Sequence, residues 1–312
     1  MFTGAQPSPL DKVIQAENAL LQGSYKLAYE LSLLPSSSIK LDKLKILYHL
    51  ERAELEQAEQ GIEKLERRYS DLAETFAFSA EAWRSLGHQA SLFSKRGYYQ
   101  RAVDARIKAG DKAPNESKYL TLKASALGQG SFGGDTEGQA ELTKVIQKQE
   151  GKWADIAQIN LLQNLGKEGQ GKRLAKQLRE KYPNDFDVLE RVAQYYWSHS
   201  EQELAQISFY LACVNRPKFS WYAQVKWINA CYQSAIFAKK NKQNVELGRK
   251  ALVELTQVFT LFTEVNLELA ELLYSLPDPE AKVLAKRYVQ QLLATGGEAN
   301  LVSRANNILK SS

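Results

Sequence analysis

Two glycine-rich segments have residue types and spacings that could bind a phosphate group. Gly128-Gln-Gly130-Ser-Phe132-Gly133 resembles the glycine loop of a protein kinase, and Gly166-Lys-Glu-Gly-Gln-Gly171-Lys172 fits most of a P-loop. Both loops work only beside a β-strand. The first segment is instead followed by Asp135, a helix-starting residue type, and the second follows a helical pattern and lacks the hydroxyl that would hold magnesium. We therefore predict two turns between helices.

Other chemistry-bearing residues are too scattered, or too well balanced by charge, to predict catalysis. The three histidines, His49, His88 and His199, share no metal-ligand spacing. Glutamates recur between Glu51 and Glu66 with basic residues interleaved, as on a solvated helix face. We predict no metal, no cofactor and no enzymatic activity.

The two cysteines, Cys213 and Cys231, are too few for a disulfide framework or a four-ligand metal site. We expect both to be free thiols in a reducing cytoplasm, with Cys213 buried and inert. No stretch approaches the roughly 18 apolar residues of a membrane-spanning helix, and we expect no membrane insertion. The N-terminus carries no secretory signal pattern.

Apolar residues recur at three- and four-residue spacings along almost the whole chain, which predicts helices. Short breaks containing glycine, proline or serine separate about sixteen such segments of 11 to 20 residues. Connections this short make consecutive helices antiparallel. The expected fold class is all-α.

The helical pattern repeats with a period near 34 residues. Large residues align at steps of 36, 34, 36 and 33, and an apolar residue stands three positions after each one; the aligned residues are Trp83, Tyr119, Trp153, Leu189 and Tyr222. A small residue follows at three of the five positions, which lets two helices approach closely. Each repeat therefore predicts one helix hairpin.

This pattern resembles the tetratricopeptide repeat (TPR) family. The segment from Asp185 to Pro217 matches it best: Leu189, Val192, Ala193 and Tyr196 occupy its first-helix positions, and Ala205, Phe209, Ala212 and Pro217 follow at the family's spacing. The resemblance implies a right-handed α-α superhelix of about eight hairpins with a C-terminal capping helix. It covers 1–312 as one array, with the best repeats at 80–217 and degenerate repeats at 9–79 and 218–312.

The same resemblance implies that first-helix positions line a concave groove that binds a protein or peptide. Here the candidate groove residues are Arg84, His88, Gln158, Glu190, Gln194, Trp197 and Trp227. Trp197 and Trp227 are the expected anchors, since buried aromatics carry much of an interface's energy. The competing interpretation is that neighbouring helices cover both rings.

Residues 216–250 hold eight basic side chains against Glu246 alone, although the whole chain carries only +5. The candidate patch comprises Arg216, Lys218, Lys226, Lys239, Lys240 and Lys242, with aromatic residues interleaved. Such a surface could bind RNA, single-stranded DNA or another acidic ligand, which is the alternative function. The competing interpretation is aromatics in the core and lysines in a solvated turn. The chain could also form a homodimer through its terminal repeats.

Overall fold

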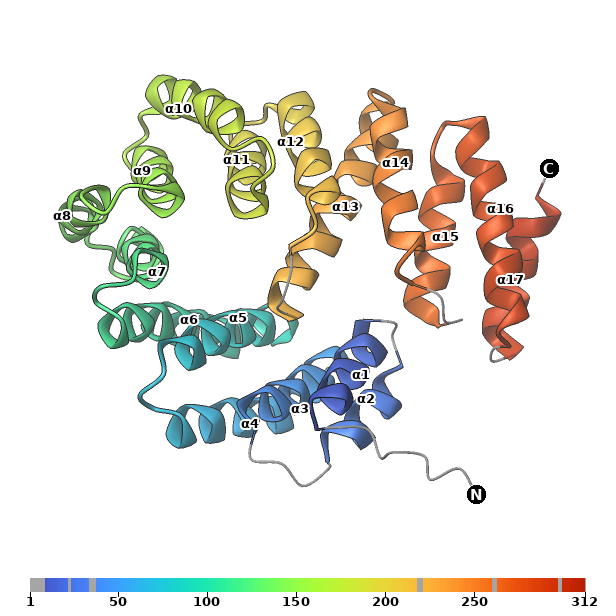
Figure 1. Ribbon diagram of the computed structural model, residues 1–312, viewed down its shortest axis with the longest axis horizontal. Coiled ribbons are helices and arrows are strands. Elements are labelled where there is room, and N and C mark those ends of the chain that lie inside the picture. The colour runs from blue at the N-terminus through green and yellow to red at the C-terminus, as the bar shows by residue number, and fades with distance from the viewer. Residues whose placement is uncertain are drawn as a thin grey trace. The chain divides into compact units, whose positions relative to one another are not determined.

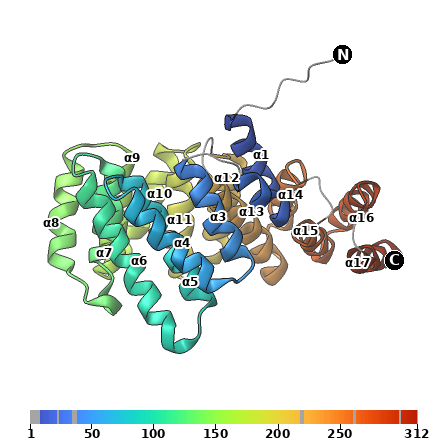
Figure 2. The ribbon, with the colours of Figure 1, turned by 90° about the horizontal axis from the view of Figure 1, so that it is seen from below.

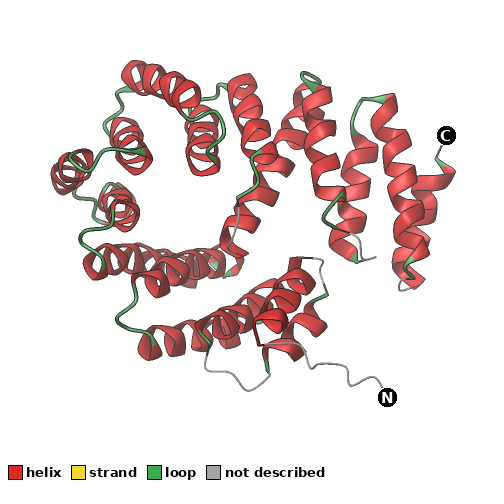
Figure 3. Cartoon of the chain, viewed as in Figure 1, coloured by secondary structure: helices red, strands yellow, loops and turns green. Residues whose placement is uncertain are grey.

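The computed structural model describes residues 9–21, 24–33, 38–217, 221–259, 263–296 and 299–311 (Figure 1). Over these ranges the regular structure is entirely helical, with no strand (Figure 3). The helices up to the middle of the chain are α1 (Pro9–Leu21), α2 (Tyr25–Ser32), α3 (Ile39–Glu51), α4 (Leu55–Arg68), α5 (Ala73–Gln89), α6 (Leu92–Lys112), α7 (Ser117–Leu127), the 3-10 turn η1 (Gly130–Phe132), α8 (Thr136–Gln147) and α9 (Lys152–Asn164). The rest are α10 (Glu168–Lys181), α11 (Phe186–Ser198), α12 (Gln202–Val214), α13 (Trp221–Asn241), α14 (Val245–Thr256), α15 (Glu264–Ser275), α16 (Pro279–Ala294) and α17 (Ala299–Lys310).

Consecutive helices pack as hairpins, as the short connections predict. α3 packs on α4, α5 on α6, α11 on α12, α13 on α14 and α15 on α16, and α17 follows the last pair. First helices also contact the first helix of the next hairpin, in the series α3, α5, α7, α9 and again in α13, α15, α17. The predicted all-α fold of hairpins with a terminal helix is confirmed.

The chain divides into two compact units, and the division falls within α10 between Gly171 and Lys172. The first unit contains α1–α9 and the second contains α11–α17. Figure 2 gives a second view of the helices in each unit. We describe the units separately, and one continuous array over 1–312 stays a prediction.

Apolar stripes and caps explain the hairpins. In α11 the residues Val188, Leu189, Val192 and Ala193 are fully buried, at the spacing that puts them on one helix face. Asp185 begins α11 by accepting a hydrogen bond from the Val188 amide at 3.2 Å.

Asp135 begins α8 in the same way, accepting from the Gly138 amide at 2.8 Å. The segment before it, Gly128–Gly134, is a turn that includes η1, and Gly166–Lys167 lies between α9 and α10. The first glycine-rich segment is therefore a turn between helices, as predicted, whereas the second is a turn only at Gly166 and Lys167 and continues as helix from Glu168.

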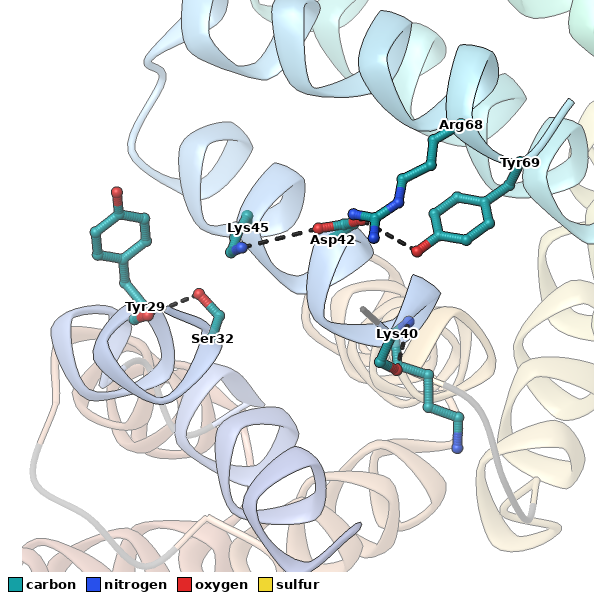
Figure 4. Close-up of polar contacts among 8 residues, drawn as sticks. Tyr29, Ser32, Lys40, Asp42, Lys45, Arg68 and Tyr69 are labelled. Atoms are coloured by element: carbon teal, nitrogen blue, oxygen red, sulfur yellow. Dashed lines mark hydrogen bonds and ion pairs between the residues drawn. The ribbon is translucent and has the colours of Figure 1, made fainter. Parts of the chain in front are cut away.

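Polar contacts also fasten the first unit's hairpins (Figure 4). Asp42, in the first turn of α3, accepts hydrogen bonds from Arg68 Nη1 at 3.0 Å and from Tyr69 Oη at 3.3 Å at the end of α4. Lys45 lies 3.8 Å from the other carboxylate oxygen. In α2, Ser32 donates to the Tyr29 carbonyl oxygen at 2.6 Å. The α3–α4 hairpin is thus joined at the end opposite its turn.

The prediction of free thiols is wrong. Cys213 in α12 and Cys231 in α13 form a disulfide bond, with both residues buried. The number of cysteines does not reveal that two adjacent helices, α12 and α13, place the two sulfur atoms together. A cytoplasmic location stays a prediction, and the disulfide argues against it because such bonds are rare in cytosolic proteins.

Candidate functional site

Three of the predicted groove residues lie together on one face of α11. Glu190, Gln194 and Trp197 are spaced by four and three residues, which aligns them along a helix. Gln194 Nε2 donates a hydrogen bond to Glu190 Oε1 at 3.2 Å. Trp197 is 45% exposed, whereas the opposite face of α11 is buried.

Trp197 is held by two buried aromatic rings. Its ring meets Phe209 of α12 and Phe237 of α13 edge to face, with both centroid distances at 6.2 Å. Phe209 and Phe237 stack on each other, and each is almost completely buried. The indole of Trp197 therefore packs against two buried rings, while the rest of its surface is exposed to solvent. That arrangement suits an interface anchor, since little side-chain freedom is left to lose on binding.

Trp227, the other predicted anchor, is not in a groove. It is only 2% exposed, and its indole N–H donates to the Cys213 carbonyl oxygen. The Arg216 guanidinium covers the ring at 4.6 Å from its centroid. Trp227 is a core residue of the α12–α13 contact, so its assignment to the groove is wrong.

The error comes from the register of α13. Its buried residues repeat the buried pattern of α11 when Cys231 is aligned with Leu189, a shift of 42 residues. The sequence alignment instead placed Tyr222 against Leu189, a shift of 33. α13 is 21 residues long, against 13 for α11, so the period of 34 fails at this helix.

A close backbone approach fixes the true register. A Cβ on Gly248 of α14 would lie 2.5 Å from the Ala238 Cβ and 3.1 Å from the Ala235 Cα, closer than carbon atoms pack. The hairpin therefore closes at Ala235 and Ala238. These small residues, followed by Gly248, were the sequence signal that could have revealed the register.

In the corrected register, four residues of α13 occupy the positions that correspond to the exposed face of α11. Asn229, Ile236 and Lys239 are exposed and Tyr232 is half-buried. None of the four was predicted as a groove residue, and Lys239 was predicted only as part of the basic patch. Ile236 adds an exposed apolar side chain next to Phe237, the ring that supports Trp197. We call Glu190, Gln194, Trp197, Asn229, Tyr232, Ile236 and Lys239 the α11–α13 surface.

Carboxylates of α15 border this surface. Burial raises the pKa of Tyr232, and the charge of Glu268 raises it further. The pKa of Glu268 is itself raised, by burial first and then by Glu264. Arg304 of α17 binds Glu264 at 2.9 Å and Glu271 at 3.0 Å, so two of the three α15 carboxylates are paired with a cation.

The predicted basic patch divides along α13. Arg216 and Lys226 lie near its first turns, whereas Lys239, Lys240 and Lys242 lie at its end. Thirteen residues separate Lys226 from Lys239, a rise of about 20 Å in a helix. Lys218 lies outside the described residues. Trp227 and Phe237 are buried, so these two rings of the predicted nucleic-acid site cannot stack on bases.

The first unit holds the remaining predicted groove residues, each with a neighbour. Arg84 Nη2 pairs with Glu81 at 2.9 Å, and Gln158 Oε1 accepts from Gln147 at 2.6 Å. His88 Nδ1 lies 3.1 Å from the Tyr99 hydroxyl. Its pKa is lowered by burial, and further by the positive charges of Arg84 and Lys95.

A cavity of about 190 Å³ lies between α4, α5 and α6. It is lined by Glu63, Glu66, Trp83, Arg101, Asp104, Ala105 and Lys108. Small-molecule sites usually enclose roughly 300–1,000 Å³.

Part of the glutamate run therefore makes contacts between helices instead of forming a purely solvated face. Arg101 Nη1 binds Glu59 at 2.9 Å and Glu63 at 3.0 Å, and Trp83 Nε1 donates to Glu66 at 3.0 Å. These contacts fasten α6 and α5 to α4, because the charges across the helices are paired.

Over the described ranges no three His, Cys, Asp or Glu side chains gather as metal ligands, and no helix has the length and hydropathy to cross a membrane.

No family model and no curated protein sequence matches this chain. Among solved structures, it is similar to a thermophilic TPR protein of Thermus thermophilus, with a TM-score of 0.41 and 14% identity over 72% of this chain and 98% of that one. It is also similar to a chain of the APC/C hetero-tetramer Cut9–Hcn1, with a TM-score of 0.37 and 12% identity. That match covers 96% of this chain and 55% of the other. Both likenesses are too low to carry an argument. The hairpins, the close-packed small residues and the repeated burial pattern described above show an all-α fold of repeated helix hairpins.

Proposed function

We propose that the protein is a non-enzymatic scaffold that binds a protein partner at the α11–α13 surface. The observation that supports this most is Trp197, which is 45% exposed and fixed from below by Phe209 and Phe237. Helical repeat folds of this kind generally mediate protein–protein interaction through the exposed faces of successive helices.

The chemistry of the surface indicates what a partner segment would present. Trp197 and Ile236 offer apolar area for one or two apolar side chains. Glu190 and Gln194 supply polar acceptors beside the indole, and Glu268 lies beyond Tyr232. A peptide with an apolar residue next to a basic one would fit this order of groups.

Nucleic-acid binding is less well supported than protein binding. It needs a continuous basic surface with stacking aromatics, whereas Lys226 and Lys239 lie at different ends of α13 and the nearby rings of Trp227 and Phe237 are buried. A homodimer stays a separate prediction, which light scattering on the full chain would check.

The test is affinity capture with full-length tagged baits, followed by quantitative mass spectrometry and then by titration of the purified partner. Trp197→Ala and Ile236→Ser should each lose the wild-type partner, because both remove apolar area from the surface. Val283→Ser is the matched control, since Val283 is 59% exposed on α16, away from the α11–α13 surface. Retention of every wild-type partner by the folded Trp197→Ala bait would overturn the proposal.

A further inference from the structure

The turn between α5 and α6 presents the most exposed large apolar side chains of the described chain. Phe93 is 100% exposed and Leu92 is 86% exposed. The two residues are adjacent, in the first turn of α6. Large apolar side chains left completely in water mark contact sites when they cluster.

The first turns of α6 extend past the core that holds the rest of the helix. α6 has 21 residues, but its buried residues begin only at Ala102. α5 ends at Gln89 and α6 begins at Leu92, so the first turns of α6 come before its buried stretch. Figure 2 shows α6 reaching beyond its neighbours at the lower edge of the first unit.

The sequence segment that forms this tip is basic and contains no acidic residue. No Asp or Glu occurs between Ala82 and Val103, the segment that contains Lys95 and Arg96. Arg84 and Arg101 of the same segment pair with glutamates, whereas no carboxylate among the described residues pairs with Lys95 or Arg96. Lys95 lies over the Tyr99 ring at 5.8 Å, and Arg96 is exposed.

The start of α6 adds positive potential to these two charges. Its N-cap residue, Ser91, caps no backbone amide of the helix, since its hydroxyl bonds to the Ser94 hydroxyl at 3.1 Å, and the first turn has no acidic residue. The positive end of the helix dipole and the free amide groups of that turn therefore face outward, an arrangement that favours phosphate.

We propose that this tip, from Ser91 to Gly97, docks on an anionic lipid surface. Phe93 and Leu92 would enter the boundary between headgroups and acyl chains, while Lys95, Arg96 and the helix start would meet lipid phosphates. A lipid surface is the occupant that the geometry favours, because a stable protein interface needs about 20–30 residues on each side with complementary shape. The tip is instead a convex projection of seven residues, and a fluid surface requires no complementary pocket. The contact is peripheral and crosses no bilayer.

Sedimentation with vesicles tests the proposal on the full-length protein. Phosphatidylcholine vesicles that contain phosphatidylserine should bind the wild type, and pure phosphatidylcholine vesicles should bind it much less. Leu92→Ser with Phe93→Ser should reduce partitioning at least about tenfold, since each apolar side chain transferred from water contributes that much or more. Val283→Ser, at another exposed apolar residue, should leave binding unchanged.

The charges are tested separately. Lys95→Gln with Arg96→Gln should weaken binding to the anionic vesicles by roughly tenfold or more, and salt should have a similar effect. Lys144→Gln with Lys148→Gln, an exposed basic pair at the end of α8, is the control and should bind as the wild type does. Circular dichroism confirms that each variant is folded, which is expected because the substituted side chains are outside the core. Wild-type protein that ignores phosphatidylserine, or a Leu92/Phe93 variant that binds like the wild type, would overturn the proposal. Neither outcome bears on the α11–α13 surface, which belongs to the other unit.

Discussion

Trp197 and Trp227 are both predicted groove anchors, eight residues after the aligned Leu189 and five residues after the aligned Tyr222, yet one is half exposed and the other is in the core. Trp197 follows Ala193 by four residues on a helix whose register agrees with the repeat. Trp227 lies on α13, where the close approach of Gly248 to Ala235 and Ala238 shifts the register by nine residues. The comparison teaches that the tightest backbone contact decides which side of a helix is buried. The position of a large aromatic residue does not.

The largest loss in the free energy of unfolding is expected from Trp227→Ala. The side chain is 2% exposed and its N–H binds the Cys213 carbonyl, so its loss leaves both a cavity and an unpaired acceptor. The free energy of unfolding of the second unit should fall by about 3–5 kcal/mol. Urea unfolding followed by circular dichroism measures this. A loss no greater than that of Trp197→Ala would show that the two rings are equally exposed.

Reduction of the Cys213–Cys231 disulfide should cause the next largest loss of stability. The bond closes a segment of 18 residues that includes Arg216, the residue that covers Trp227. Opening a loop of this length should lower the stability of the folded state by about 3 kcal/mol. Thermal unfolding with and without dithiothreitol measures the shift. The Cys213→Ala, Cys231→Ala variant is the control, because reductant should not affect it.

Gly248→Ala should have a smaller effect that reports on register. The added Cβ would meet Ala238 and force α13 and α14 apart, at a cost of about 1–3 kcal/mol in unfolding free energy. Gly97→Ala in α6 is the matched comparison, since nothing lies within 4 Å of its added Cβ. That variant should gain about 0.5–1 kcal/mol, because alanine favours the helix. Equal effects at the two glycines would contradict the close contact.

The smallest effect on stability is expected from Trp197→Ala, which should lose partner binding instead. Only part of the ring is buried, and Phe209 and Phe237 keep their own stacking contact without it. We expect a loss of about 1 kcal/mol in unfolding free energy, well below that of Trp227→Ala. A loss as large as that of Trp227→Ala would place Trp197 in the core.

The sequence was sufficient for the hairpins because local patterns determine them. Apolar spacing, Asp185 and Asp135 at helix starts, and Gly and Pro between helices all act over a few residues. Glu190, Gln194 and Trp197 were found because α11 follows the repeat. Local patterns do not predict contacts between helices. The Cys213–Cys231 bond and the close approach of Gly248 to α13 depend on packing between separate segments. The exposure of Leu92 and Phe93 was not predicted, because the sequence pattern of two apolar residues at a helix start is typical of buried residues.

Hydroxyl-radical footprinting of the native wild-type protein, resolved residue by residue by mass spectrometry, tests the assignment of the two tryptophans most directly. Oxidation follows side-chain exposure, so Trp197 should react much faster than Trp227, and both should react alike once the chain is unfolded in urea. Trp83, which is 2% exposed in the first unit, provides an internal reference for a buried indole. A native protein in which Trp227 is oxidised as fast as Trp197 would contradict the register of α13 and the α11–α13 surface that depends on it.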